Sequence, residues 1–186
     1  MSFRKLLAAL TAAVALVAVP VVTTSASAAP ASAPSSAGQA AYAAQAVEAG
    51  LTGQQAAGLQ ADVDAALARQ VGARQVSANR IAFDGGSATL AAPGQSGARD
   101  LAAPQAAPSC ANGYLCIIDG RGTRYEYYTC GYYSFSGIGD GTFNNNQTSG
   151  TVARFYNSDG SQRWTSTAKA TGTASWTPVY YIRPCG

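Results

Sequence analysis

The 186-residue chain contains no histidine, and charged residues make up only 11% of it. Without histidine it cannot form a Ser-His-Asp or Cys-His catalytic group. Carboxylates of the C-terminal part could form an acid–base pair, but three of them stand beside glycine in turn-like sequence: Asp119, Asp140 and Asp159. No phosphate-binding or nucleotide-binding motif occurs. These absences favour a binding protein over an enzyme.

Positive charge is also scarce. The net charge is +3, and lysine occurs only twice. Arg4 and Lys5 lie in a segment that we expect to be removed, which leaves a net charge near +1. A surface that binds nucleic acid needs a cluster of basic residues, so nucleic acid is not an expected partner.

The N-terminal residues have the three parts of a secretory signal peptide. Arg4 and Lys5 are followed by the apolar run Leu6–Val22 and then by Ala26-Ser27-Ala28, a small-x-small cleavage pattern. We expect cleavage after Ala28 and secretion of the remainder. A membrane anchor is the alternative, but the apolar run is short, and no later stretch is long enough to span a bilayer. No membrane association is expected.

The first 109 residues contain no cysteine, whereas the last 77 contain four. An even number in a small exported segment favours two disulfides. A zinc site is the alternative, but no Cys-x-x-Cys pair and no histidine is present. Three pairings are possible, and the sequence does not decide between them. We favour Cys110–Cys116, which closes a local loop, and Cys130–Cys185, which ties the C-terminal strand to the middle of the domain.

Two segments precede the cysteine-containing part. Residues 29–50 are rich in Ala and Ser and predict a flexible lead-in, with a possible short helix over 39–49. Residues 51–92 predict a helix plus a β-hairpin. Thr52 to Gln55 fits a capping box, and apolar residues follow at helical spacing. Asp84-Gly85-Gly86 fits the turn of a hairpin with arms over 75–83 and 87–91.

The unit over 51–92 is small for independent folding. It is therefore expected either to pack on the C-terminal domain or to behave as a loosely folded pro-segment. Residues 93–108 are rich in Ala, Pro and Gly and predict a linker. Arg99-Asp100 within that linker is a weak candidate for proteolytic processing.

Residues 109–186 carry nine of the ten tyrosines and both tryptophans. Short runs rich in Thr, Tyr and Val alternate with turn residues, which predicts an all-β sandwich or barrel. A loop-rich middle is marked by several glycines between 131 and 141. The expected strands lie over 114–118, 124–129, 151–156, 162–166 and 179–183.

Three stretches of this domain carry a resemblance to a known family. They are Cys110-Ala-Asn-Gly-Tyr-Leu-Cys-Ile-Ile-Asp119, Phe143-Asn-Asn-Asn-Gln-Thr-Ser149 and Tyr180-Tyr-Ile-Arg-Pro-Cys185. They resemble the secreted actinobacterial metalloproteinase inhibitors with a βγ-crystallin-like fold. The resemblance covers residues 109–186. It implies two Greek-key motifs in one sandwich, two disulfides and a secreted metalloproteinase as partner.

An inhibitor of this kind needs a rigid scaffold and an exposed loop that enters the protease cleft. Two turns, each with one carboxylate, are candidates for that loop. The alternative for each, which we favour, is a plain β-turn selected for its backbone conformation. The candidate contact residues are Asp119, Gly120 and Arg121 in the first turn, and Asn157, Ser158 and Asp159 in the second.

Residues 144–149 resemble the calcium-binding motif of βγ-crystallin modules. The candidate ligands are Asn144, Asn145, Thr148 and Ser149. Calcium prefers several charged oxygen ligands, and asparagine stands here where aspartate would bind more strongly. We therefore favour a structural role for these side chains at a sharp corner, with no cofactor or a weak calcium site.

The aromatic residues allow a second function. Most are expected in the core or in cross-strand pairs. If several lay exposed on one face, they could stack on sugar rings, which would favour a carbohydrate or cell-wall binding module. We expect a monomer in either case.

Overall fold

The structure is a computed structural model that describes residues 36–95, 97–102 and 109–186. The expected signal peptide and the start of the lead-in lie outside the described residues. Within the described ranges, no helix is long and apolar enough to cross a membrane.

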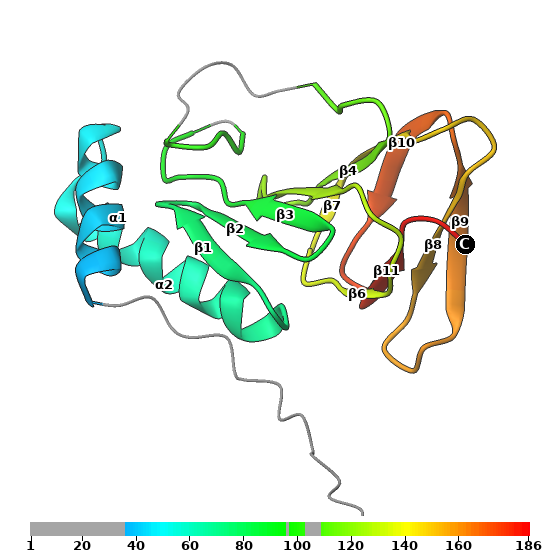
Figure 1. Cartoon of the computed structure of the whole chain (residues 1–186), viewed down its shortest axis with the longest axis horizontal. Helices are drawn as coiled ribbons and strands as arrows, with labels where there is room; N and C mark the ends of the chain where they lie inside the picture. The colour runs from blue at the N-terminus through cyan, green and yellow to red at the C-terminus, as the bar shows by residue number, and fades with distance from the viewer. Residues whose placement is uncertain (1–35, 96, 103–108) are drawn as a thin grey trace, which may run out of the picture.

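Two antiparallel sheets dominate the fold, as expected for an all-β domain (Figure 1). The first sheet has the order β1-β2-β3-β5-β4-β7-β10 and the second the order β6-β11-β8-β9. The front part contributes β1 (Arg74–Ser77), β2 (Arg80–Phe83) and β3 (Gly86–Thr89). The cysteine-containing part contributes β4 (Tyr114–Ile118), β5 (Arg124–Tyr127), β6 (Tyr133–Ser134), β7 (Asp140–Asn146), β8 (Val152–Tyr156), β9 (Gln162–Thr167), β10 (Ala170–Ser175) and β11 (Tyr181–Arg183).

The eight strands from β4 to β11 form two consecutive units of four. In the first unit, β4, β5 and β7 share the first sheet, while β6 lies in the second. In the second unit, β8, β9 and β11 share the second sheet, while β10 lies in the first. Each unit therefore places its third strand in the sheet of the other. This exchange locks the two units into one sandwich.

The two sheets meet through aromatic side chains. Trp176 is fully buried, and its ring centroid lies 5.8 Å from that of Phe155 in β8. Phe143 of β7 lies 5.4 Å from Trp164 of β9, which stacks on Phe155 at 3.8 Å. These rings supply much of the apolar area that the small sandwich buries.

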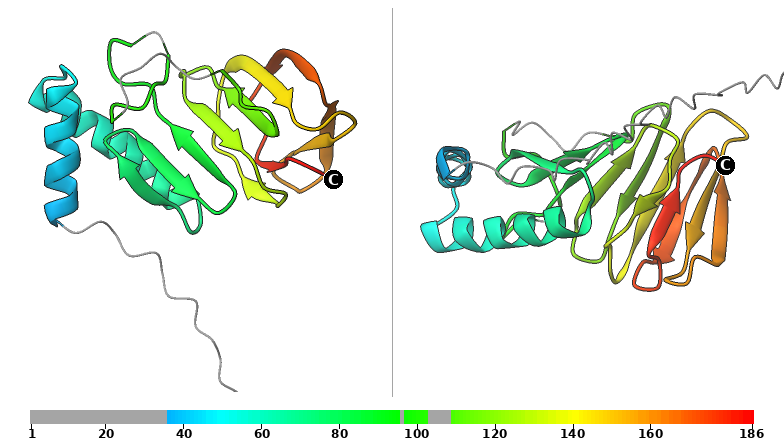
Figure 2. Two further views of the ribbon diagram at one scale, coloured as in Figure 1. Left: turned by 45° about the horizontal axis from the view of Figure 1, so that its top comes forward. Right: turned by 60° about the horizontal axis from the view of Figure 1, so that its bottom comes forward.

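Two helices precede the strands. Helix α1 (Ser36–Glu48) corresponds to the possible short helix over 39–49 and begins three residues earlier, so this part of the expected lead-in is helical. Helix α2 (Gly53–Arg69) begins with the expected capping box, in which Thr52 and Gln55 satisfy each other's backbone N–H groups. Leu59 and Val63 of α2 are buried. Figure 2 shows α2 along one face of the front strands.

The predicted hairpin over residues 75–91 is a three-stranded meander. Its first arm is divided into β1 and β2 by a turn at Asn79. The Asn79 side chain is fully buried, where it donates to the carbonyls of Leu90 and Arg99 and accepts from the Leu101 N–H. An asparagine that satisfies three backbone groups favours a turn over a continuous strand.

The front part joins the same sheet as the C-terminal domain. Strand β3 pairs with β5 over four residues, from Gly86–Tyr127 to Thr89–Arg124. One continuous hydrophobic core extends from Leu59 in α2 to Ile182 in β11. The front part therefore packs on the C-terminal domain as an extension of its sheet, which was the first of the two expected arrangements.

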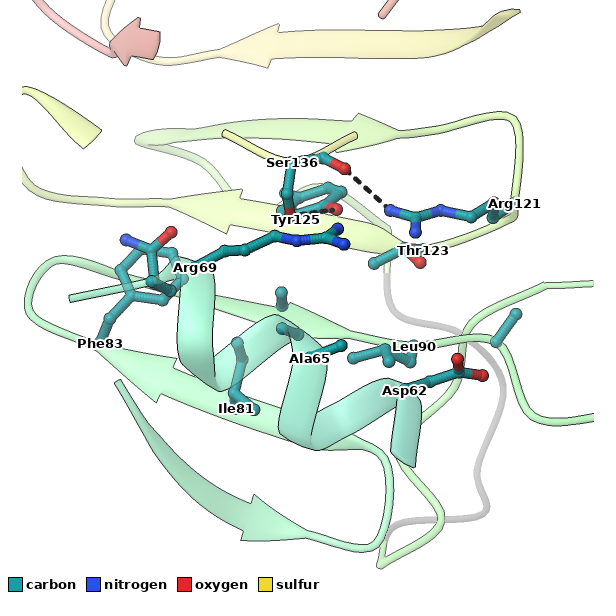
Figure 3. A pocket seen from close by; sticks show the side chains of 14 residues that line it. Asp62, Ala65, Arg69, Ile81, Phe83, Leu90, Arg121, Thr123, Tyr125 and Ser136 are labelled. Atoms are coloured by element: carbon teal, nitrogen blue, oxygen red, sulfur yellow. Dashed lines mark hydrogen bonds between the residues drawn. The ribbon is translucent and has the colours of Figure 1, made fainter. Parts of the chain in front are cut away.

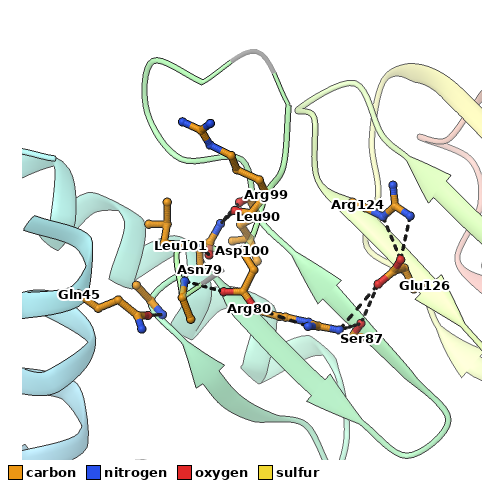
Figure 4. A network of polar contacts seen from close by, with 12 residues as sticks. Gln45, Asn79, Arg80, Ser87, Leu90, Arg99, Asp100, Leu101, Arg124 and Glu126 are labelled. Carbon is orange, nitrogen blue, oxygen red and sulfur yellow. Dashed lines mark hydrogen bonds and ion pairs between the residues drawn. The ribbon is translucent and has the colours of Figure 1, made fainter. Parts of the chain in front are cut away.

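The first part of the expected linker is not free. Asp100 lies 3.5 Å from the Arg80 guanidinium, and Leu101 is buried (Figure 4). Asn79 holds the Arg99 carbonyl. The candidate processing point at Arg99-Asp100 is thus held against β2, while residues 103–108 lie outside the described residues.

Candidate functional site

The turn between β8 and β9 is the more exposed of the two candidate loops. The Asn157 N–H donates to the Ser161 carbonyl at 2.9 Å, and the Gly160 N–H donates to the Asn157 carbonyl at 3.1 Å. Gly160 has a φ of 79°, a conformation that favours glycine. Ser158, Asp159 and Gly160 are all exposed.

Side chains reinforce this turn. Asp159 Oδ1 accepts hydrogen bonds from the Ser161 N–H at 2.9 Å and from the Ser161 hydroxyl at 2.6 Å. Asn157 donates to the same hydroxyl at 2.9 Å. The Ser161 hydrogen bonds lower the pKa of Asp159, so the carboxylate stays ionised. Its second oxygen, Oδ2, has no hydrogen bond to any residue that the structure describes and points a free negative charge toward solvent.

The turn after β4 is different, because Asp119 is buried. Its carboxylate accepts hydrogen bonds from the N–H groups of Arg121, Thr123 and Ile138, at 3.0, 2.9 and 3.3 Å. It also pairs with the Arg121 guanidinium at 3.1 Å. The Asp119 carboxylate is therefore not available to a partner, since the loop uses it to fix its own backbone.

Gly120 and Arg121 are also used within the molecule. The Gly120 N–H donates to the Ile138 carbonyl, and a Cβ atom at Gly120 would lie 2.9 Å from that oxygen. Arg121 donates to the Ser136 carbonyl at 2.9 Å. The loop is thus pressed against residues 136–139, and only glycine fits at its point of closest approach.

A cleft of about 230 Å³ lies where this loop faces the front part (Figure 3). Arg121, Tyr125 and Ser136 line it from the C-terminal domain, while Asp62 and Arg69 of α2 line it from the front part. The loop after β4 is consequently flanked by α2. The β8–β9 turn does not line this cleft and is the more exposed of the two candidates.

The four candidate calcium ligands do not converge through their side chains. Asn144 and Asn145 are neighbours in β7, so they point to opposite faces of the sheet. Asn145 is fully buried and donates to the Ser166 carbonyl at 2.8 Å. Thr148 and Ser149 are exposed in the turn that follows. The described residues contain no group of three or more metal-binding His, Cys, Asp or Glu side chains.

The four cysteines form the two favoured disulfides, Cys110–Cys116 and Cys130–Cys185. The first joins the approach to β4 with β4 itself. The second joins the β5–β6 connection to the segment after β11 and continues the β6–β11 pairing of the second sheet, in which Tyr133 lies opposite Ile182. It therefore ties the C-terminal end of the chain to the second sheet. Two disulfides indicate an oxidising environment.

The aromatic residues divide into a buried and an exposed group. Tyr127 is fully buried beside Phe83, and burial raises the pKa of its hydroxyl well above the usual value. Tyr132, by contrast, is 54% exposed. Its ring lies 5.1 Å from Tyr181 and 5.3 Å from Tyr156, both half-buried. Sequence reasoning did not identify this cluster, because its members come from β8, β11 and the segment before β6.

No family model, curated protein or solved structure matches this chain. The arrangement of its own residues is therefore the basis for any functional conclusion.

Proposed function

We propose that the protein is a secreted inhibitor of extracellular metalloproteinases and that the β8–β9 turn is its contact with the protease. The observation that carries the proposal is the Asp159 carboxylate at the tip of an exposed turn, with one oxygen fixed by Ser161 and the other free. A catalytic zinc keeps one coordination position open for water or substrate. A carboxylate held on a projecting turn suits that position.

The strand topology supports a βγ-crystallin-like fold for residues 109–186. Two successive four-strand units, each of which gives its third strand to the other sheet, are what two interlocked Greek keys require. We infer that the resemblance found in the sequence extends to this topology. Secretion through residues 1–28 belongs to the same proposal and agrees with the two disulfides.

Rigidity is what makes such a turn useful to an inhibitor. A loop that is already ordered loses little conformational entropy when it docks. Here Asn157 and Asp159 both bond to Ser161, and the turn is continuous with the β8–β9 ladder. The ladder belongs to a sheet in which Cys130–Cys185 ties the segment before β6 to the segment after β11. The position of the carboxylate is therefore set by the second sheet.

Replacement of Asp159 by Asn tests the proposal. Asn keeps an oxygen that accepts from Ser161, so the turn should persist, but the negative charge is lost. We expect the inhibition constant against a thermolysin-like zinc protease to rise at least about tenfold, equivalent to about 1.4 kcal/mol. The measurement is a titration of protease activity with the chain from residue 29 onward, with both disulfides intact.

Asp140→Asn is the matched control. Asp140 is also exposed and next to glycine, but it lies in β7, away from the turn. It should leave the inhibition constant unchanged. Equal effects of the two variants, or no inhibition by the parent chain of several secreted zinc proteases, would refute the proposal.

The exposed tyrosine cluster favours a second candidate, a module that binds polysaccharide. Tyr132, Tyr156 and Tyr181 present adjacent rings on the outer side of the second sheet, and aromatic faces stack on sugar rings. Tyr132→Ala should then abolish retardation of the chain in gels that contain a polysaccharide. Tyr128→Ala is the control, because Tyr128 is 48% exposed but packs on Tyr114 instead. No retardation of the parent chain in any polysaccharide gel would eliminate this candidate.

A further inference from the structure

The two edge strands of the seven-stranded sheet, β1 and β10, differ in whether their outer backbone groups are covered. At the β1 end, helix α1 covers the outer edge. Tyr42 donates its hydroxyl hydrogen to the Gln75 carbonyl at 3.0 Å, and Gln45 accepts from the Ala78 N–H at 2.6 Å. Side chains from α1 thus satisfy backbone groups that would otherwise be open to a further strand. Natural sheets commonly cover their edges in this way.

The opposite end, β10, is open. The Trp176 N–H bonds to the Gly139 carbonyl, which sets the alternation of the β10–β7 ladder. Every second residue from Trp176 backward therefore bonds to β7. The residues between them turn their N–H and C=O groups outward: Thr171, Thr173 and Ser175. No residue that the structure describes pairs with these groups.

Strand β10 also lacks the features that usually protect an edge. Its six residues, Ala-Thr-Gly-Thr-Ala-Ser, include no proline and no charge. Protected edges are typically short, charged or interrupted by proline. An unprotected edge of this length can accept an extended peptide as an added strand.

A groove runs beside this edge. Arg163 and Trp164 of β9 and Thr173 to Ser175 of β10 line a volume of about 300 Å³. Trp164 is only partly buried, so part of its ring is open to the groove. Figure 1 shows β9 and β10 next to each other at the same end of the sandwich. In strand addition, the backbone supplies affinity and such pockets supply specificity.

The residues of β10 and of the groove indicate which kind of segment would bind there. A second copy would offer β10 itself, whose small side chains would leave the groove over Trp164 unfilled. A large apolar side chain would fill it. Arg163 lines the same groove, and one nitrogen of its guanidinium donates to Asn157 at 3.3 Å. We propose that the β10 edge binds an extended peptide segment of a partner protein, with a large apolar residue over Trp164 and an acidic residue near Arg163.

This site adjoins the β8–β9 turn proposed for protease inhibition, since Arg163 contacts Asn157, but the partner and the readout differ, so either proposal can fail alone. The probe is the blocked peptide acetyl-Thr-Val-Phe-Thr-Asp-Val-Thr-amide, in which Phe and Asp share one face of an extended strand, added to the chain from residue 29 onward. We expect saturable shifts of the Thr171, Thr173 and Ser175 amide signals and of the Trp164 indole signal in nitrogen–proton NMR spectra. The same peptide with Phe replaced by Ala should bind at least tenfold more weakly.

Two variants test the mechanism. Thr173→Pro removes an outward N–H without loss of a bond to β7, and it should weaken peptide binding at least tenfold. Thr173→Val keeps the N–H and should bind normally. Arg163→Gln should weaken binding about twofold to fivefold, the effect of one exposed charge pair. If circular dichroism shows that Thr173→Pro does not fold, the comparison of Arg163→Gln with the parent chain replaces it as the test.

Three results would overturn the proposal. The first is the absence of peptide-induced shifts in β10 at millimolar peptide. The second is equal binding by Thr173→Pro and Thr173→Val when both are folded. The third is a concentration-dependent shift of the β10 signals without peptide, which would identify a second copy of the chain as the occupant.

Discussion

A chain that starts at Ser109 is expected to lose at least about 3–5 kcal/mol of stability relative to the chain from residue 29 onward, the range for loss of one large buried aromatic partner. The reason is the pairing of β3 with β5, which joins the front part to the C-terminal domain and is called the β3–β5 seam below. Tyr127 is fully buried in the whole chain, with the Phe83 ring 5.8 Å away. Removal of the front part exposes Tyr127 and opens the β5 edge.

The same cut disrupts a polar network. Glu126 lies 3.8 Å from Arg80 and accepts a 3.5 Å hydrogen bond from Ser87, both in the front part (Figure 4). Within the C-terminal part, only the 2.8 Å pair with Arg124 would remain. An open edge next to an exposed apolar surface also promotes aggregation. Native stability is commonly only 5–15 kcal/mol, so this loss is a large share of it.

Phe83→Ala in the intact chain isolates the same contact. It should lower the free energy of unfolding by about 3–5 kcal/mol. Val71→Ala, at a position that is 91% exposed in the front part, should change it by less than about 0.5 kcal/mol. The measurement is urea unfolding followed by tryptophan fluorescence. If the chain from Ser109 unfolds at the same urea concentration as the longer chain, the seam does not contribute to stability.

Removal of the Cys130–Cys185 disulfide should cost about twice as much as removal of Cys110–Cys116. The bonded residues are separated by 55 positions in the first case and by 6 in the second. In the chain-entropy description, closing the longer loop stabilises the fold by about 4 kcal/mol and the shorter loop by about 2 kcal/mol. The longer one also ties the C-terminal segment to the β5–β6 connection.

The test compares two double variants under non-reducing conditions. One carries Cys130→Ser with Cys185→Ser, and the other carries Cys110→Ser with Cys116→Ser. Each pair leaves the other disulfide intact. Equal losses of unfolding free energy, or a larger loss from the Cys110–Cys116 variant, would show that loop length does not set the contribution of these bonds.

Local patterns predicted the elements whose sequence determines their own conformation. The strand over 114–118, the capping box at Thr52 and the tight turn at Asn157 lie where the sequence placed them. Each depends on residues within a few positions of one another. The favoured pairing of the cysteines, one of three possible, is also the one observed.

Three strands of the C-terminal domain were not predicted: β6, β7 and β10. The two longer ones, β7 and β10, contain glycine together with asparagine or other small residues, which suggest a loop, and their pairing depends on distant residues. Position 141 of β7 requires glycine, because a Cβ atom there would collide with the Ile118 carbonyl oxygen of the neighbouring strand. Position 172 of β10 favours glycine, because a Cβ atom there would come within 2.9 Å of the Phe143 ring. Such glycines mark close packing, which no local pattern reports.

The candidate loops show the same limit. Asp119-Gly120 and Asp159-Gly160 are the same dipeptide, and both form turns. Asp119 is buried, and its carboxylate accepts hydrogen bonds from Thr123, at the far end of the turn, and from Ile138, outside it. Among the described residues, Asp159 bonds only to Ser161, within its own turn. Burial separated a structural carboxylate from an available one, and burial is a property of the folded chain.

Hydrogen exchange of the chain from residue 29 onward, with and without a stoichiometric amount of a thermolysin-like zinc protease, tests the central claim most directly. The account predicts a one-to-one complex in which slowed exchange centres on residues 157–161 of the β8–β9 turn. Absence of a complex, or slowed exchange centred on the 119–122 loop with the β8–β9 turn unchanged, would contradict it.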